Sequence, residues 1–101
     1  MTGKQDALLI AAVIADDVEA VQLLLESGVD ADCCEDEAQL RPLHFAALYD
    51  SPRVIPLLIM AGADLMSTTD CDDTPLSIAK RHGNQAVMQA LSRYSLMAGQ
   101  A

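Results

Sequence analysis

Residues 41–47 are Arg-Pro-Leu-His-Phe-Ala-Ala, and the same frame returns 33 residues later as Thr-Pro-Leu-Ser-Ile-Ala-Lys at 74–80. The segment Leu-Leu-Ile-Met-Ala-Gly-Ala-Asp at 57–64 has a counterpart 34 residues upstream, Leu-Leu-Leu-Glu-Ser-Gly-Val-Asp at 23–30. A period of this length is typical of stacked repeats, because one such unit is too small to close a core of its own. The sequence therefore predicts an array of similar units.

These two motifs resemble the ankyrin repeat, whose signature is Thr-Pro-Leu-His-x-Ala followed by Leu-Leu-Leu-x-x-Gly-Ala-Asp. The resemblance covers about residues 6 to 93. It implies an all-α, ankyrin-like solenoid of three helix-turn-helix repeats joined by β-hairpin-type loops, within a single domain over 1–101. We place repeat 1 at about 6–37, repeat 2 at about 38–70, repeat 3 at about 71–93, and a C-terminal tail that frays at 94–101.

The first helix of each later repeat begins at a proline. Pro42 and Pro75 suit a first helical turn, because proline has a fixed φ and that turn needs no N–H from it. Thr74 can cap the helix before Pro75, since its hydroxyl accepts an early backbone N–H. Arg41, at the equivalent place, cannot cap in this way, so we expect a weaker helix start there.

Three residue pairs mark breaks between the two helices of each repeat: Asp-Asp at 16–17, Asp-Ser at 50–51 and Gly-Asn at 83–84. Gly, and less easily Asp or Asn, accepts the left-handed backbone that ends a helix. Gly28 and Gly62 are expected to end the second helices of repeats 1 and 2 in the same way. Pro52 should begin the second helix of repeat 2, and Pro56 should distort its first turn.

Apolar residues recur in register, as expected for two stacked layers of helices. They are Leu9, Ala12, Val21, Leu24 and Leu25 in repeat 1, Leu43, Ala46, Ile55, Leu58 and Ile59 in repeat 2, and Leu76, Ala79, Met88 and Leu91 in repeat 3. The chain has only three aromatic residues, so this core must be aliphatic.

Composition restricts the class of protein. A hydrophobic fraction of 51% with 21% charged residues favours an ordered globular chain. The longest apolar run, residues 7–15, is far shorter than the roughly 20 residues that span a bilayer. With Lys4 ahead of it the run imitates a short signal peptide, but cleavage would delete the first helix of repeat 1. We therefore expect a cytoplasmic protein that does not bind membranes.

The cysteines indicate reduced thiols, because their number is odd and no Cys-x-x-Cys spacing occurs. A metal- or redox-responsive role for Cys33, Cys34 and Cys71 stays open as a less favoured alternative. His44 stands at the histidine of the signature, where the resemblance implies a hydrogen bond to the adjoining connection. Residues 70–75 lack the glycine of a calcium loop, and no nucleophile is spaced to suit His44. We expect neither catalysis nor a cofactor or metal site.

The charged residues are concentrated between the repeats. Nine of the fifteen carboxylates lie in two connections, Asp30, Asp32, Glu35, Asp36 and Glu37 in the first, and Asp64, Asp70, Asp72 and Asp73 in the second. One interpretation is that they only keep the chain soluble. The other is that they attract a basic partner. With a net charge of −9 and only six scattered basic residues, we expect no direct binding to nucleic acid.

The resemblance implies that these connections are projecting fingers and that the first helices share a concave surface with them. By position, the helix residues on that surface are Ile14 and Ala15, Leu48 and Tyr49, and Arg81 and His82. We predict partner-binding residues at Glu35, Asp36, Glu37, Leu40, Leu48, Tyr49, Asp70, Asp72, Asp73, Arg81 and His82. Tyr49 and Leu48 would serve as packed anchors.

The helix expected over residues 8–15 is apolar on all sides, although terminal repeats normally have a polar outer face. Part-exposed Ile10 and Val13, or a fold-back of residues 1–6, would explain it without a function. Self-association through this helix, giving a homodimer, is the alternative.

Together these features predict a non-catalytic protein-binding module, an adaptor that holds a basic partner protein. The main alternative is a small acidic inhibitor, such as a toxin-immunity protein or a phage-type antagonist of a nucleic-acid-binding protein.

Overall fold

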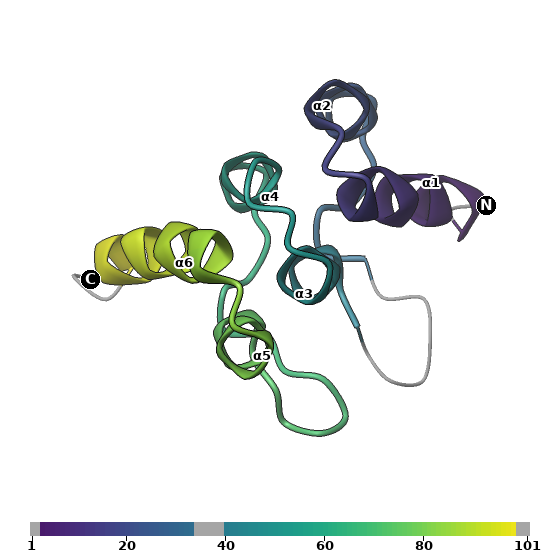
Figure 1. The fold of residues 1–101 in the computed structure, drawn as a ribbon. Helices are drawn as coiled ribbons and strands as arrows, with labels where there is room; N and C mark the ends of the chain where they lie inside the picture. Colours follow the sequence, from purple (N-terminus) through teal and green to yellow (C-terminus); the bar gives the residue numbers. More distant parts are fainter. Residues whose placement is uncertain (1–2, 34–39, 99–101) are drawn as a thin grey trace.

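The structure is a computed structural model, and it describes residues 3–33 and 40–98. Within these residues it consists of α-helices joined by turns, with no strand, which confirms the predicted all-α class (Figure 1). The helices are α1 (Gly3–Ile14), α2 (Val18–Glu26), α3 (Pro42–Leu48), α4 (Ile55–Met60), α5 (Pro75–His82) and α6 (Gln85–Ala98). None of the helices in the described part of the chain is long and apolar enough to cross a membrane.

The helices form two layers. Figure 1 shows α1, α3 and α5 in an inner row and α2, α4 and α6 in an outer row, so that each consecutive pair is one helix-turn-helix unit. The connection between α4 and α5 projects beyond the inner row, on the side away from α2 and α4. This is the arrangement expected for stacked repeats, in which each unit packs on its neighbours.

Helix ends follow the predicted chemistry. Thr74 Oγ1 accepts the Ser77 N–H at 3.2 Å and caps α5. Arg41 does not cap α3 with its side chain; instead, its own N–H donates to His44 Nδ1 at 2.9 Å. The first helix of repeat 2 is therefore held by a histidine three residues further on, where the sequence predicted a weaker start.

The breaks and helix ends adopt positive φ where the sequence predicted it. The values are 55° for Asp16, 57° for Asp50 and 70° for Gly83 at the breaks within repeats, and 103° for Gly28 and 105° for Gly62 after the second helices. Each residue type is one that accepts this region at low cost, which confirms the predicted turn positions.

The second helix of repeat 2 starts later than predicted. We expected it to begin at Pro52 with a distorted turn, but residues 52–54 form a turn and α4 begins at Ile55. The Ile55 N–H bonds to the Pro52 carbonyl at 3.4 Å, and Pro56 falls in the first helical turn. In the first turn a proline loses no helical hydrogen bond, which explains why the helix begins at Ile55 and not at Pro52.

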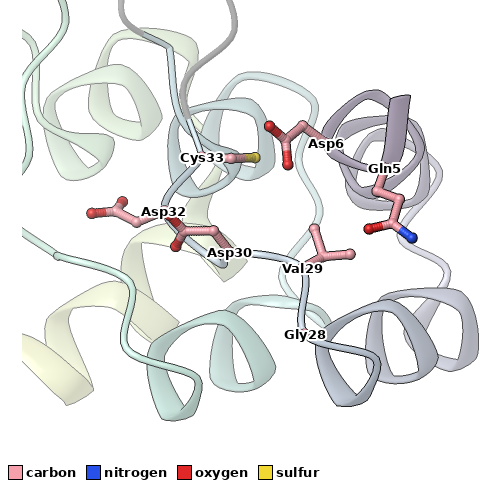
Figure 2. A pocket seen from close by; sticks show the side chains of 7 residues that line it. All are labelled: Gln5, Asp6, Gly28, Val29, Asp30, Asp32 and Cys33. Carbon is pink, nitrogen blue, oxygen red and sulfur yellow. The ribbon is translucent and has the colours of Figure 1, made fainter. Parts of the chain in front are cut away.

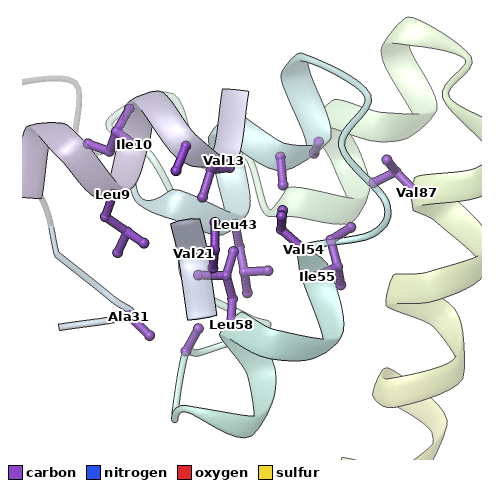
Figure 3. Close-up of a cluster of buried hydrophobic side chains, with 14 of the residues drawn as sticks. Leu9, Ile10, Val13, Val21, Ala31, Leu43, Val54, Ile55, Leu58 and Val87 are labelled. Atoms are coloured by element: carbon purple, nitrogen blue, oxygen red, sulfur yellow. The ribbon is translucent and has the colours of Figure 1, made fainter. Parts of the chain in front are cut away.

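The core is one aliphatic cluster that runs through all three repeats (Figure 3). Of the predicted apolar positions, Leu24, Leu25, Ile59, Leu76 and Met88 are only partly buried against this cluster. The others are buried, and Val13, Val54 and Val87 join them. The connections contribute Val29, Ala31 and Ala63, which the helical pattern did not predict.

α1 buries more of its apolar side chains than the sequence suggested. Ile10 and Val13 are buried, so the explanation that both are part-exposed is wrong. The exposed side is mostly alanine around Leu8, whose side chain is 53% exposed. Residues 1–2 lie outside the described part, and homodimer formation through α1 stays a prediction.

The last helix continues beyond the predicted end of repeat 3. We expected a fraying tail from Tyr94, but α6 extends to Ala98. The added segment Tyr-Ser-Leu-Met-Ala at 94–98 contains three good helix formers, Leu, Met and Ala, which explains the longer helix.

Candidate functional site

The connection between repeats 2 and 3 is ordered by Thr69. Its backbone N–H donates to the Asp73 carbonyl and its carbonyl accepts from the Asp72 N–H, both at 3.0 Å. Its hydroxyl accepts from the N–H groups of Cys71 at 3.2 Å and Asp73 at 3.3 Å. Asp72 completes the turn with a φ of 62°. We call residues 69–73 the second finger.

Behind the second finger lies a hollow of about 230 Å³, which we call the concave groove. Its lining residues come from the segment just before α3, from the end of α3, from the finger and from α5: Leu40, Leu48, Thr69, Asp70, Cys71, Asp73, Ile78, Arg81 and His82. Ile78 is buried and Leu40 and Leu48 are half-buried, whereas Asp70 and His82 are exposed. The groove thus combines an apolar interior with a charged border.

Six of the predicted partner-binding residues meet in this groove: Leu40, Leu48, Asp70, Asp73, Arg81 and His82. Tyr49 and Asp72 are exposed but do not line it. Tyr49 directly follows α3, and its ring stacks on that of Phe45 within the helix, with 6.4 Å between ring centroids. Glu35, Asp36 and Glu37 lie outside the described residues.

Sequence reasoning missed three lining residues. Ile78 lies one helical turn before Arg81, so the spacing of α5 could have placed it on the same face. Thr69 and Cys71 had no signal of their own, because their position depends on how the finger turns.

Arg81 and Asp73 form an ion pair across the groove border. Arg81 Nη2 donates to Asp73 Oδ1 at 2.6 Å. This hydrogen bond, together with the charge of Asp73, raises the pKa of Arg81 above its usual value. The Asp73 carboxylate is therefore already paired, and Asp70 is the exposed carboxylate that lines the groove.

Cys71 is an exposed thiol at the tip of the finger. The neighbouring Asp70 charge, followed by a hydrogen bond to the same carboxylate, raises the pKa of Cys71. A thiol with a raised pKa is a poor nucleophile and a poor metal ligand at neutral pH, because both roles need the thiolate.

His44 fastens the second connection to α3. Its ring is fully buried, and Nδ1 accepts from Arg41 N–H while Nε2 lies 2.9 Å from the Ser67 carbonyl. Because Nδ1 is an acceptor, the proton must be on Nε2, which donates to Ser67. The structural role that the resemblance implied for His44 is therefore confirmed.

Arg41 holds the first connection. Its Nη1 donates to Asp32 Oδ2 at 3.0 Å and to the Asp32 carbonyl at 3.2 Å. We predicted no partner for Arg41, and this ion pair ties the start of α3 to the first connection.

A second hollow, of about 280 Å³, is lined by residues of α1 and of the first connection, among them Asp6, Asp30 and Asp32 (Figure 2). Figure 2 shows the Asp32 side chain directed away from Asp6, and its Oδ2 is paired with Arg41. Within the described part of the chain, no three His, Cys, Asp or Glu residues form a group that could hold a metal ion. Cys34 lies outside that part.

A family model described as ankyrin repeats (many copies) matches residues 8–59. The chain belongs to the ankyrin repeat family. It is 41% identical to the 2-5A-dependent ribonuclease of Mus musculus over 76 residues, which is 75% of this chain and 10% of that protein. It is 36% identical over 77 residues to the Homo sapiens protein of the same name, covering 76% of this chain and 10% of the relative. The Caenorhabditis elegans Ankyrin repeat and LEM domain-containing protein 1 homolog shows the same values.

This ankyrin repeat chain thus spans about a tenth of the length of these relatives. Ankyrin repeats generally bind other proteins, and the family is typically non-catalytic. The ribonuclease activity in the names of two relatives belongs to proteins that are much longer than this chain.

Proposed function

We propose that this ankyrin repeat chain is a non-catalytic adaptor that holds a basic segment of a partner protein in the concave groove. The observation that carries the proposal is that Leu48, Asp70 and Arg81, from three separate segments, line one hollow with an apolar interior. Such a groove can bury the aliphatic stem of a lysine or arginine while a carboxylate at the border receives its charged end.

The charge of the chain supports a basic partner. The net charge is −9, and Asp70 and Asp72 present exposed carboxylates on the second finger. An acidic border steers a basic partner toward the groove and raises its association rate, an effect that salt weakens. Glu35, Asp36 and Glu37 of the first connection would add to this field.

The same surface supports the second candidate function, a small inhibitor that blocks a nucleic-acid-binding protein. The second finger is held rigidly by Thr69 and projects from the stack, so its carboxylates could occupy phosphate positions in a basic groove. Competition decides between the two functions: nucleic acid displaces the chain from the partner of an inhibitor but not from the partner of an adaptor.

The test is a pull-down with the tagged chain and identification of captured proteins by mass spectrometry, followed by affinity measurement at several salt concentrations. Asp70→Asn/Asp72→Asn should weaken capture of the concave-groove partner and flatten its salt dependence. Asn accepts the left-handed backbone of Asp72, so this variant should fold normally.

The matched control is Glu19→Gln/Glu26→Gln, which removes the same two charges from α2 in the outer layer. It should leave capture of that partner unchanged. Equal loss in both double variants would show a general effect of net charge and would remove the concave groove from the mechanism.

Self-association through α1 is a separate proposal. Within the described part of α1, the large exposed apolar residues are Leu8 and Ile14, and Leu8 is the more exposed of the two. Light scattering at high protein concentration measures the mass. A monomer in wild type, or a dimer that Leu8→Ser leaves intact, counts against this helix as the dimer surface.

A further inference from the structure

The outer layer carries a groove of its own, on the side of the stack opposite the second finger. It has a volume of about 310 Å³ and lies between α2 and α4, and we call it the outer groove. Its lining residues are Gln22, Leu25, Glu26, Leu57, Met60 and Ala61. None of them lines the concave groove, so the two surfaces are separate.

The outer groove continues along α2. An adjoining hollow of about 270 Å³ is lined by Glu19, Gln22, Leu23 and Glu26, so the two hollows share Gln22 and Glu26. Met60 on one side is 81% exposed and Leu23 on the other is 67% exposed. Large apolar side chains gathered around one groove are typical of an interaction surface, and methionine adapts its shape to a partner.

The charge of this surface is of one sign. Glu19 and Glu26 border the groove, and no lysine or arginine among the described residues lines either hollow. Gln22 Nε2 donates to Glu26 Oε2 at 3.3 Å, which holds that carboxylate beside the groove. An apolar groove with acidic borders complements an apolar stripe flanked by basic residues.

The surrounding elements favour a helical occupant. Both walls are α-helices whose backbone groups bond within the helices, so an extended peptide would find no sheet edge to pair with. An amphipathic helix satisfies its own backbone and can pack its side-chain ridges between two neighbouring helices.

We propose that the outer groove binds a basic amphipathic helix of a protein partner, independently of the concave groove. Apolar side chains of that helix contact Leu23, Leu57 and Met60, and its lysines or arginines pair with Glu19 and Glu26. The chain would then present two binding surfaces on opposite sides of one stack, as a protein that bridges two partners requires.

The test uses a fluorescent peptide of about 18 residues, designed as an amphipathic helix with a leucine stripe flanked by lysines, and reads binding by fluorescence anisotropy. Leu23→Ser/Met60→Ser should lower the affinity at least about tenfold. The matched control is Leu8→Ser/Met66→Ser, which removes exposed apolar side chains that are 53% and 67% exposed elsewhere on the molecule. That control should stay within about twofold of wild type, as expected for side chains outside the interface.

Charge variants separate this proposal from the concave groove. Glu19→Gln/Glu26→Gln should weaken peptide binding and flatten its salt dependence clearly more than Asp70→Asn/Asp72→Asn, which removes the same number of charges away from the outer groove. Circular dichroism confirms that each variant is folded. The proposal is overturned by absence of wild-type binding, by equal effects of the matched pairs, or by a doubled wild-type mass that Leu23→Ser/Met60→Ser abolishes.

Discussion

His44 shows how one side chain can fix the protonation state that the fold needs. Nδ1 accepts from Arg41 N–H and Nε2 donates to the Ser67 carbonyl, so only the neutral ring fits between them. Burial is the main cause that lowers the pKa of His44 below its ordinary value, and the Arg41 charge acts in the same direction. Hydrogen bonding to Ser67 and the charge of Asp32 oppose this shift but do not cancel it.

The free energy of unfolding should therefore depend on pH through His44. A histidine with a lowered folded-state pKa binds fewer protons in the folded chain than in the unfolded chain. Its contribution is present above the unfolded pKa of about 6.5 and is lost as pH falls from there through the folded pKa. We predict a lower urea midpoint at pH 5.5 than at pH 7.5.

The control is His44→Gln, which cannot titrate. It should lose about 1–3 kcal/mol at pH 7.5, because buried groups of Arg41 and Ser67 lose a partner. The difference between wild type and this variant should shrink as pH falls. A difference that stays constant between the two pH values would show that His44 does not cause the pH dependence.

At the scale of the helices, the sequence predicted the breaks correctly because they depend on local backbone chemistry. Asp16, Asp50 and Gly83 have the left-handed backbone that their residue types suggested. The start of α4 was predicted wrongly, because two prolines, Pro52 and Pro56, each offered a plausible first turn. A helix that begins at Ile55 has Pro56 in its first turn, where no backbone N–H is needed. A helix that begins at Pro52 would lose an internal hydrogen bond at Pro56.

The two kinds of glycine turn should differ in what they tolerate. Gly83 has a φ of 70°, close to the aspartates that replace it in repeats 1 and 2, whereas Gly62 has a φ of 105°, beyond the left-handed region open to other residues. An added Cβ meets nothing within 4 Å at either place, so any cost comes from the backbone. We predict that Gly62→Asn costs about 1–2 kcal/mol and that Gly83→Asn costs clearly less.

Urea unfolding of the two variants in parallel measures this difference. Each variant adds the same side chain at a helix end, so each serves as the control for the other. Equal destabilisation would show that the φ difference between the two glycines has no energetic consequence.

At the scale of the whole molecule, the 33-residue repeat of the sequence predicted much of the candidate site. Residues one repeat apart, such as Leu48 and Arg81, lie on one surface because the repeats stack in register. The outer groove could not be predicted in this way. The apolar register already separated Leu24 and Leu25 from Leu23, but it did not indicate that the exposed Leu23 and Met60 border two adjoining hollows.

The single core cluster predicts that the array unfolds as one unit. Leu58 is fully buried in this cluster, which extends from Leu9 in α1 to Leu91 in α6. Leu58→Ala leaves a cavity and should cost about 2–5 kcal/mol, which is a large part of the stability of a small domain. Because the same cluster joins all three repeats, the loss should lower one shared transition.

Leu23→Ala is the matched control, since the same side chain is removed from an exposed position on α2, and it should change the free energy of unfolding by no more than about 0.5 kcal/mol. Urea unfolding followed by circular dichroism, and by Tyr94 and Tyr49 fluorescence, measures both variants. A two-step curve in Leu58→Ala would contradict the prediction, because it would mean that one repeat unfolds while its neighbours keep their packing.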